Sequence, residues 1–241
     1  MKKRAIIVGA SSGIGKGLAE LLVREGYIVG ITGRREALLN DLKNSAPNSY
    51  IVKSFDVDDY SNIKSNLDDL ANQLEDVELF ILSSGTGKRN PELELSYEVM
   101  TLSTNVTGFT TVINWAYKYF ENRGGGYLTA ITSIAGFRGF SMSPSYSASK
   151  SFQMRYMEAL RQKSRCDGNK ISVTDIRPGF VDTAMGNGEG AFWIASVKKS
   201  SVQILSAIRG RKGVAYITKR WFFVALFLRL IPSAIFERVR V

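Results

Sequence analysis

Tyr146 and Lys150 are the residues whose types and spacing most directly suggest chemistry. They stand four residues apart in SPSYSASK, residues 143–150, so a helix beginning near Ser145 would place both side chains on one face. An ammonium beside a phenol favours the phenolate, which moves a pKa of about 10 toward neutrality and makes the phenol a usable proton donor or acceptor. The same spacing also arises by chance on solvated helix surfaces, so the rest of the chain must decide between the two interpretations.

Composition narrows the chemistry that is available. The 241 residues are 44% hydrophobic, enough to bury a sizeable core, and we expect one domain over residues 1–241. With no histidine and a single cysteine, Cys166, zinc sites, histidine-based triads and an internal disulfide are excluded. No metal site is expected, and proton chemistry must use Tyr, Lys, Asp or Glu. Because no secretory leader opens the sequence, we expect a cytoplasmic protein.

Short β-rich runs alternate with amphipathic stretches of helical period. A helix is predicted over residues 14–24 and another from about residue 35. Apolar runs such as AIIVG and LFIL suit parallel strands that are buried on both faces. The pattern predicts an α/β fold, a single-domain Rossmann-type doubly wound parallel sheet flanked by helices on both faces. The predicted strands are RAIIVG, YIVGIT, YIVKSF, ELFILS, GYLTAIT and KISVTDI.

A glycine-rich turn follows the first predicted strand. VGASSGIG places Gly9, Gly13 and Gly15 where the strand ends and the first helix begins. There, Gly9 allows a tight turn, Gly13 lets the backbone approach a pyrophosphate, and Gly15 permits close packing of helix on strand. The spacing G-x-x-x-G-x-G differs from the usual G-x-G-x-x-G pattern and from the GxxxxGK[ST] triphosphate loop. By itself such a turn is weak evidence for a dinucleotide site.

Further motifs follow the glycine turn in a fixed order. They are Asn105 in TNVTG, Ser133 upstream of YSASK, and PGFVDT at residues 178–183, directly after the sixth predicted strand. Together with the turn they resemble the compact branch of the short-chain dehydrogenase/reductase family, over about residues 4–183. The resemblance implies that Tyr146 is the general acid or base and that Lys150 lowers its pKa.

The resemblance also assigns the remaining site residues. It implies that Ser133 holds the substrate oxygen and that Asn105 anchors a proton-relay water. Such a set suits carbonyl reduction, in which alkoxide charge develops beside a proton donor while a cofactor supplies hydride. Alone, Ser133 and Asn105 would be interpreted as residues that satisfy nearby backbone groups, but the joint pattern favours catalysis. The implied cofactor contacts are Gly9, Ser11, Ser12, Gly13, Ile14, Gly15, Arg34, Arg35, Asp56, Val57, Ser83, Gly85, Asn105, Tyr146, Lys150, Pro178, Gly179, Val181 and Thr183.

The chain departs from the family pattern at the end of the fourth predicted strand. Where the family has Asn-Ala-Gly, this chain has Ser83-Ser84-Gly85. A serine hydroxyl is shorter than an asparagine side chain and lacks its separate donor and acceptor atoms. We expect an altered scaffold on the adenosine side rather than an inactive site. Asp56 and Val57 resemble the pair of residues that contacts the adenine in this family, although Asp56 also fits a strand-end cap.

The cofactor preference depends on TGRRE at the end of the second predicted strand. An NAD-selective site has an acid there that binds the ribose 2′-hydroxyl, but this chain has Gly33, followed by Arg34 and Arg35. Guanidinium groups suit a 2′-phosphate, and cations at a helix start oppose the helix dipole unless an anion compensates them. Glu36 lies too far along to replace the acid. NADP(H) is therefore favoured over NAD(H), with solvated helix-start charges as the alternative.

These features favour an NADP(H)-dependent oxidoreductase that interconverts a small-molecule ketone or aldehyde and an alcohol. The alternative is a non-catalytic dinucleotide-sensing or membrane-docking protein of the same fold, which would need the glycine turn but no phenol beside a lysine. A sugar-nucleotide epimerase of the family's longer branch would need a larger C-terminal substrate domain. We expect a homodimer or homotetramer.

Residues 183–212 are expected to form a substrate lid. Glycines in this stretch suit a mobile loop, and its two aromatic rings either close over a lipophilic substrate or pack the lid against the core. The residues concerned are Gly186, Gly188, Gly190, Phe192 and Trp193.

The excess of basic over acidic residues lies in the C-terminal part of the sequence. Residues 1–185 carry 22 Lys/Arg against 20 Asp/Glu, whereas residues 186–241 carry 10 against 2. Nucleic acid is not an expected partner, because no zinc-finger or RNA-binding signature accompanies the charge.

The tail, residues 219–241, combines this charge with apolar residues. Arg229 and Pro232 interrupt its apolar run too early for a membrane span. Three interpretations remain: packing on its own domain or on a second subunit, an interfacial helix on anionic lipid, or a platform for an acidic protein. The lipid interpretation implies peripheral membrane association.

Overall fold

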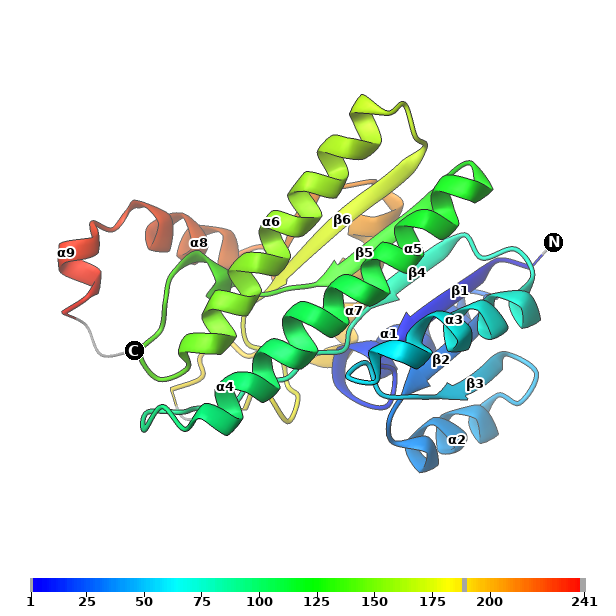
Figure 1. The fold of residues 1–241 in the computed structure, drawn as a ribbon, viewed down its shortest axis with the longest axis horizontal. Helices are drawn as coiled ribbons and strands as arrows, with labels where there is room; N and C mark the ends of the chain where they lie inside the picture. Colours follow the sequence, from blue (N-terminus) through cyan, green and yellow to red (C-terminus); the bar gives the residue numbers. More distant parts are fainter. Residues whose placement is uncertain (1, 188–189, 239–241) are drawn as a thin grey trace.

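A parallel β-sheet forms the centre of the molecule. The computed structural model describes residues 2–187 and 190–238. In these residues seven strands lie in the order β3-β2-β1-β4-β5-β6-β7, and each neighbouring pair is parallel (Figure 1). The predicted doubly wound α/β fold is confirmed. The strands are β1 (Arg4–Val8), β2 (Ile28–Gly33), β3 (Tyr50–Ser54), β4 (Leu79–Leu82), β5 (Gly126–Ile131), β6 (Ile171–Pro178) and β7 (Val214–Ile217).

Helices cover both faces of the sheet (Figure 1). Apolar residues of α1, α2 and α7 share one buried cluster, and those of α3, α5 and α6 share another. The two clusters are separated by the sheet, so each face has its own core. The helices are α1 (Gly13–Arg24), α2 (Glu36–Ser45), α3 (Tyr60–Leu74), α4 (Leu95–Leu102), α5 (Phe109–Arg123), α6 (Pro144–Cys166), α7 (Val197–Arg209), α8 (Trp221–Leu230) and α9 (Ser233–Phe236).

Strand β1 shows why the central strands are apolar without alternation. Ala5 and Ile7 belong to the cluster under α1, α2 and α7, whereas Ile6 and Val8 belong to the cluster under α3, α5 and α6. All four are at most 1% exposed. A strand between two helical layers must be apolar on both faces, which explains the continuous AIIV run.

The side of the sheet on which new strands are added changes between β3 and β4. The first three strands are added outward from β1, and β4 then returns to pair with β1 on its other side. In doubly wound sheets ligands bind beyond the carboxyl ends of the strands at such a switch point. The loops after β1, β4, β5 and β6 meet at this end of the sheet, and they carry most of the predicted site residues.

A π-helical turn interrupts the long helical segment after β4. It spans Ser103–Gly108, between α4 and α5, and contains Asn105. Asn105 therefore stands on the fourth long helical segment, as expected. A π turn widens the helix locally and is frequent at functional sites. Here it brings a buried asparagine beside the loop after β4.

The predicted lid contains two parts with different structure. Residues 197–209 form α7, whose Ile204, Leu205 and Ile208 are buried in the core beside α1. The burial of α7 is at odds with a mobile lid over residues 197–209, and for the residues before α7 the lid stays a prediction. Gly188 of the predicted lid lies outside the described residues.

The tail lies at the end of the molecule opposite the N-terminus (Figure 1). Trp221 and Ala225 of α8 are buried, and Arg138 donates hydrogen bonds to the carbonyls of Leu228 and Ile231. The tail thus packs on its own domain through one face of α8. Within the described residues no helix has the length and apolar character needed to cross a membrane. Residues 239–241 of the tail lie outside that part.

Candidate active site

Three loops lie close together at the switch point: the glycine turn after β1, the loop after β4 and the loop after β6. Gly9 has a positive φ of 89°, and a β-carbon there would lie 2.5 Å from the backbone nitrogen of Ser84 after β4. Gly13 begins α1, and a β-carbon there would lie 3.0 Å from Cγ2 of Thr183. Because only glycine leaves this space open, the turn, the β4 loop and the loop after β6 can surround the N-terminus of α1, which favours an anion.

Two arginines at the start of α2 have different partners. Arg35 reaches the glycine turn, where its Nη2 donates hydrogen bonds to Ser11 Oγ at 2.8 Å and to Ser12 Oγ at 2.6 Å. Arg34 points elsewhere, with its Nη1 3.7 Å from Oδ2 of Asp56. The structure therefore brings Arg35, Ser11 and Ser12 together beside the turn, whereas Arg34 is paired with Asp56 on the β3 side.

Ser133 and Tyr146 meet at the carboxyl end of β5. Ser133 follows β5 and caps a short 3-10 helix, Ile134–Phe137, by accepting a hydrogen bond from the amide of Ala135 at 3.1 Å. Tyr146 lies in the first turn of α6, where Pro144 favours helix initiation. The Ser133 hydroxyl acts on the phenol of Tyr146 and lowers its pKa. A hydroxyl pair of this kind can bind and protonate a single substrate oxygen.

Burial dominates the electrostatics of the Tyr146–Lys150 pair. Burial raises the pKa of Tyr146, and the Ser133 hydroxyl opposes this shift. Burial also lowers the pKa of Lys150 to about 8, against the attraction of Asp175. The Lys150 ammonium lies 5.7 Å from the centroid of the Tyr146 ring. The expectation of a lowered Tyr146 pKa is therefore not met by the protein's own groups, because desolvation of the phenolate exceeds the opposing effect of the Ser133 hydroxyl.

Asn105 holds the loop after β4. Its Oδ1 accepts a hydrogen bond from the Thr86 amide at 2.9 Å, and its Nδ2 donates to the Thr86 carbonyl at 2.7 Å and to Ser149 Oγ at 3.1 Å. Its backbone carbonyl accepts a hydrogen bond from Gln153. The protein itself thus engages both the side chain and the carbonyl of Asn105, so the water-anchoring role implied by the family resemblance stays a prediction.

Gly87 and Gln153 belong to this site although the sequence analysis did not select them. A β-carbon at Gly87 would overlap the ring of Tyr146, so this glycine lets the β4 loop lie directly against the phenol. Gln153 is fully buried and accepts a hydrogen bond from Lys150 Nζ at 2.9 Å. The sequence signal for Gln153 was its position three residues after Lys150 on the same helix face.

The other predicted cofactor residues surround the same end of the sheet. Gly15 packs against the Gly9 carbonyl, and Ile14 packs at the edge of the core. On the β3 side, the carboxylate of Asp56 accepts a hydrogen bond from the amide of Asp58 at 3.1 Å, as a strand-end cap would. Val57 is buried.

Ser83 and Gly85, directly after β4, lie on the other side of the switch point. The amide of Ser83 donates to the Val8 carbonyl at 2.8 Å, and Gly85 lies beside Lys150 and Asn105. These contacts hold the β4 loop at the position where Ser83 stands in place of the family's asparagine.

The loop after β6 connects the site to the tail. Pro178 ends β6, and Gly179 lies under the indole of Trp221, where a β-carbon would overlap the ring. Val181 forms a bridge with Ala195 and so holds the residues before α7 near the sheet. Gly179 thus has a packing role toward α8 in addition to its place in the predicted cofactor loop.

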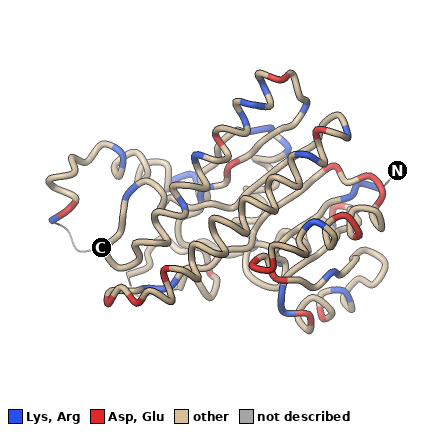
Figure 2. The backbone as a smooth tube through the Cα atoms, in the orientation of Figure 1, with Lys and Arg blue, Asp and Glu red and all other residues tan. Residues whose placement is uncertain are grey.

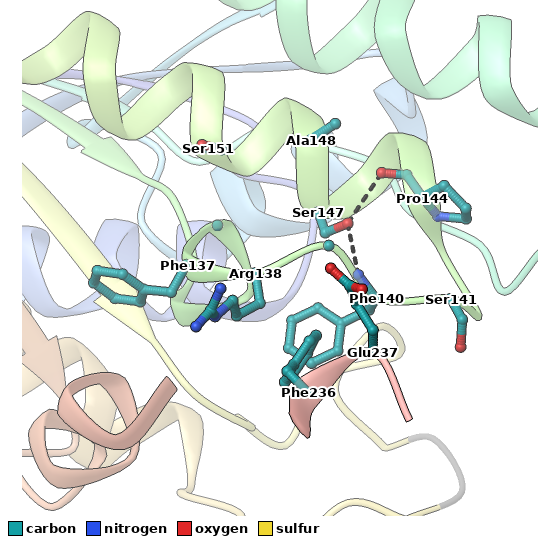
Figure 3. A pocket seen from close by; sticks show the side chains of 12 residues that line it. Phe137, Arg138, Phe140, Ser141, Pro144, Ser147, Ala148, Ser151, Phe236 and Glu237 are labelled. Carbon is teal, nitrogen blue, oxygen red and sulfur yellow. Dashed lines mark hydrogen bonds between the residues drawn. The ribbon is translucent and has the colours of Figure 1, made fainter. Parts of the chain in front are cut away.

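A cavity of about 570 Å³ opens on the neighbouring face of α6 (Figure 3). Phe140 and Phe236 line one side of it and pack edge to face, with ring centroids 5.9 Å apart. Tyr146 and Lys150 are not among the residues that line it, so this cavity is separate from the hydroxyl pair. Its lining residues are Gly136, Phe137, Arg138, Gly139, Phe140, Ser141, Pro144, Ser147, Ala148, Ser151, Phe236 and Glu237.

The geometry described above agrees with the comparisons to known proteins. The family model for short chain dehydrogenase matches residues 3–191. The chain belongs to the short-chain dehydrogenase family. An uncharacterized oxidoreductase of Myxococcus xanthus is 32% identical to it over 188 residues, which cover 76% of this chain and 74% of that protein. The resemblance drawn from the motifs is thereby confirmed.

Two further relatives bear on the cofactor and the fold. A probable NADP-dependent dehydrogenase of Haemophilus influenzae is 26% identical over 181 residues, covering 73% of this chain and 70% of that protein. The crystal structure of a 3-ketoacyl-(acyl-carrier-protein) reductase from Brucella melitensis, complexed with NADH, superposes with a TM-score of 0.79 over 89% of this chain and 95% of that one. At 18% identity, that likeness shows the fold alone.

Proposed function

We propose that this short-chain dehydrogenase family member is an NADP(H)-dependent oxidoreductase that interconverts a ketone or aldehyde and an alcohol. The observation that carries the proposal is the meeting of the Ser133 hydroxyl and the Tyr146 phenol, with the buried Lys150 beside them, at the switch point of the sheet. A protein that only senses a dinucleotide has no need of this group.

Each side chain of the group has a role in the proposed reaction. Tyr146 donates its hydroxyl proton to the substrate oxygen as alkoxide charge develops, and it accepts that proton in the reverse direction. Ser133 donates a second hydrogen bond to the same oxygen. Lys150 supplies positive charge that favours the Tyr146 phenolate left after proton transfer. A bound nicotinamide cofactor supplies or accepts the hydride.

The glycine turn and Arg35 fit such a cofactor. The space that a β-carbon would fill at Gly9 and Gly13 is open, and the N-terminus of α1 favours a pyrophosphate. Arg35, already hydrogen-bonded to Ser11 and Ser12, offers a fork of donors for a 2′-phosphate, with Arg34 as the second cation. The relative from Haemophilus influenzae named as NADP-dependent supports the same preference.

A turnover screen tests the proposal. Purified protein is incubated with a panel of ketones, aldehydes and alcohols and with NADPH, NADH or their oxidised forms, and the absorbance of the reduced nicotinamide is followed. We expect turnover that is faster with the phosphorylated cofactor and is abolished in Tyr146→Phe. Turnover that persists in Tyr146→Phe would mean that another group transfers the proton.

We further propose a lipophilic substrate. Phe192 packs against Phe180 and Trp221, with ring centroids 5.8 and 5.0 Å apart, and stays about half exposed. Trp193 is exposed to the same degree, so the residues before α7 present aromatic surface. A series of ketones of increasing chain length should show kcat/KM rising with length, and a flat series would contradict this part of the proposal.

The exposed face of α8 supports peripheral contact with anionic lipid. Phe223, Phe227 and Leu230 are 69%, 62% and 71% exposed. Most of α8 carries no charge (Figure 2), whereas Lys219 and Arg220 directly precede it in the chain. An apolar helix face beside cations suits an anionic lipid interface.

Vesicle co-sedimentation tests this contact. The intact protein should bind vesicles that contain anionic lipid, and less so at high ionic strength or as Phe223→Ala/Phe227→Ala. The control is Val202→Ala, which changes an exposed apolar residue of α7. A protein that ignores vesicles would leave only the packing role of the tail.

A row of exposed apolar residues on α4 supports self-association. Leu95, Val99 and Leu102 follow each other at helical spacing and are 74%, 56% and 43% exposed. We propose that this row contacts a second copy in a homodimer or homotetramer. Light scattering should give a multiple of 26.7 kDa that falls to one copy in Leu95→Glu/Val99→Glu, and an unchanged mass in that variant would exclude α4 as the interface.

A further inference from the structure

Gln153 connects Lys150 to the π turn of the α4–α5 segment. The side chain is fully buried. Its Oε1 accepts a hydrogen bond from Lys150 Nζ at 2.9 Å, and its Nε2 donates one to the backbone carbonyl of Asn105 at 2.9 Å. Both ends of the carboxamide are therefore used, one toward the lysine and one toward a residue 48 positions away in the chain.

The chemistry of the two partners sets the orientation of this amide. The Lys150 ammonium can only donate, so it must face the oxygen of the carboxamide. The Asn105 carbonyl can only accept, so it must face the nitrogen. A reversed amide would lose both bonds. Asn105 is itself held by Thr86 and Ser149, so Gln153 ties Lys150 to a rigid part of the site.

We propose that Gln153 is a positioning residue that holds the Lys150 ammonium in place and keeps it charged while leaving its field available to Tyr146. The proposal rests on the function proposed above. The reason for a glutamine is that a neutral oxygen stabilises an ammonium by hydrogen bonding without cancelling its charge. A carboxylate at the same position would stabilise the ammonium and also neutralise its effect on the phenol.

Few other groups act on Lys150. Tyr146 faces it from the same helix, with the ring centroid 5.7 Å from Nζ. The Ile131 carbonyl at the end of β5 accepts a weak hydrogen bond at 3.4 Å. On β6, Asp175 attracts the ammonium, but Asp175 is itself in a buried ion pair with Arg177. Gln153 is therefore the neutral acceptor nearest to the charge in the described structure.

Two substitutions separate the charge-holding role from simple packing. Gln153→Met keeps the approximate volume and removes both hydrogen bonds, whereas Gln153→Glu keeps an acceptor and adds negative charge. The matched control is Gln203→Met, because Gln203 lies on α7 and its Oε1 has no partner within the described residues. Lys150 is titrated by NMR on protein with 13C-labelled lysine side chains, its signal being assigned by its absence in Lys150→Met.

The two variants should move the Lys150 pKa in opposite directions. Gln153→Met should lower it by about 1 to 2 units, the equivalent of one hydrogen bond to a charged group. Gln153→Glu should raise it, and the control should leave it unchanged. These measurements need neither cofactor nor substrate, so they test the role of Gln153 even if the turnover screen fails.

Turnover provides the second readout. Alcohol oxidation needs the Tyr146 phenolate, so the midpoint of its pH profile should shift upward in both Gln153 variants. The shift should reach up to about 2 units, the size of a Coulomb interaction over 5.7 Å in an effective dielectric of about 20. Unchanged Lys150 titration and an unchanged pH midpoint in folded variants would overturn the proposal. Failure of both variants to fold would also overturn it, by assigning Gln153 to the core.

Discussion

Replacing Arg35 by alanine should change which nicotinamide cofactor binds. The guanidinium of Arg35 donates to Ser11 and Ser12 at the glycine turn and lies at the N-cap position of α2. In Arg35→Ala, a 2′-phosphate at this corner would lose at least one charge-assisted hydrogen bond. Such a bond is worth roughly 1.5 to 3 kcal/mol, which corresponds to a Kd for NADPH that is about tenfold to over a hundredfold weaker.

The loss should be specific for the phosphorylated cofactor. NADH lacks the 2′-phosphate, so its Kd should change by less than about threefold. Because the Arg35 side chain is exposed, unfolding free energy should change by no more than about 0.5 kcal/mol. Fluorescence titration of the reduced nicotinamide measures both Kd values. Arg209→Ala is the matched control, since Arg209 is an exposed arginine far from the glycine turn that pairs with Glu25 at 3.0 Å.

Two companion variants sharpen the test. Arg34→Ala should also weaken NADPH more than NADH, but less than Arg35→Ala does, because Arg34 is directed toward Asp56. Gly33→Asp should shift the preference toward NADH, since the nearest atom to a β-carbon there is Ser11 Oγ at 3.6 Å and a side chain fits. Equal losses of NADPH and NADH in Arg35→Ala would refute the assignment of this corner to a 2′-phosphate.

Three further outcomes are expected. Tyr146→Phe should lower kcat by a factor of about 100 or more with cofactor affinity nearly unchanged, because only the transferable proton is removed; steady-state kinetics and cofactor titration check this, and a near-normal kcat would exclude the role. Gly87→Ala should push the Tyr146 ring away and lower kcat by roughly a hundredfold with the fold retained; unaltered kcat would show that the β4 loop gives way instead. Lys150→Met should flatten the pH dependence of stability. Since burial lowers the Lys150 pKa from 10.5 to about 8, the native state binds fewer protons than the unfolded state between these values, and the wild-type unfolding free energy gains about 3 kcal/mol as pH rises through this window. Denaturant unfolding at several pH values measures the gain, and an equal gain in the variant would assign it to other groups.

Much of the fold could be predicted because its signals are local in the chain. The apolar run of β1, the glycines after it and the period of α1 lie within 21 residues, Arg4 to Arg24, and each depends on neighbours along the chain. The strand that escaped the sequence analysis is β7, Val214–Ile217. It has only four residues, too few for its own pattern to predict a strand, and it is recognised as one by its pairing with β6.

The sequence by itself determined which chemistry was available and which residues share a helix face. With no histidine, one cysteine and a tyrosine four positions before a lysine, proton transfer by a phenol was the chemistry that the residue types supported. The spacing placed Tyr146 and Lys150 on one face of α6, because helical geometry is the same wherever a helix forms. The placement of a glycine turn between strand and helix followed from the same short-range rules.

The tertiary structure alone decided which distant residues touch these groups. Arg35 rather than Arg34 reaches Ser11, Gly87 lies against Tyr146, and Gln153 links Lys150 to Asn105. Apart from the Lys150–Gln153 hydrogen bond, which lies within α6, these contacts are not encoded by spacing, because each joins elements that the order of strands in the sheet brings together. The same holds for the Tyr146 pKa, since desolvation depends on everything packed around the phenol.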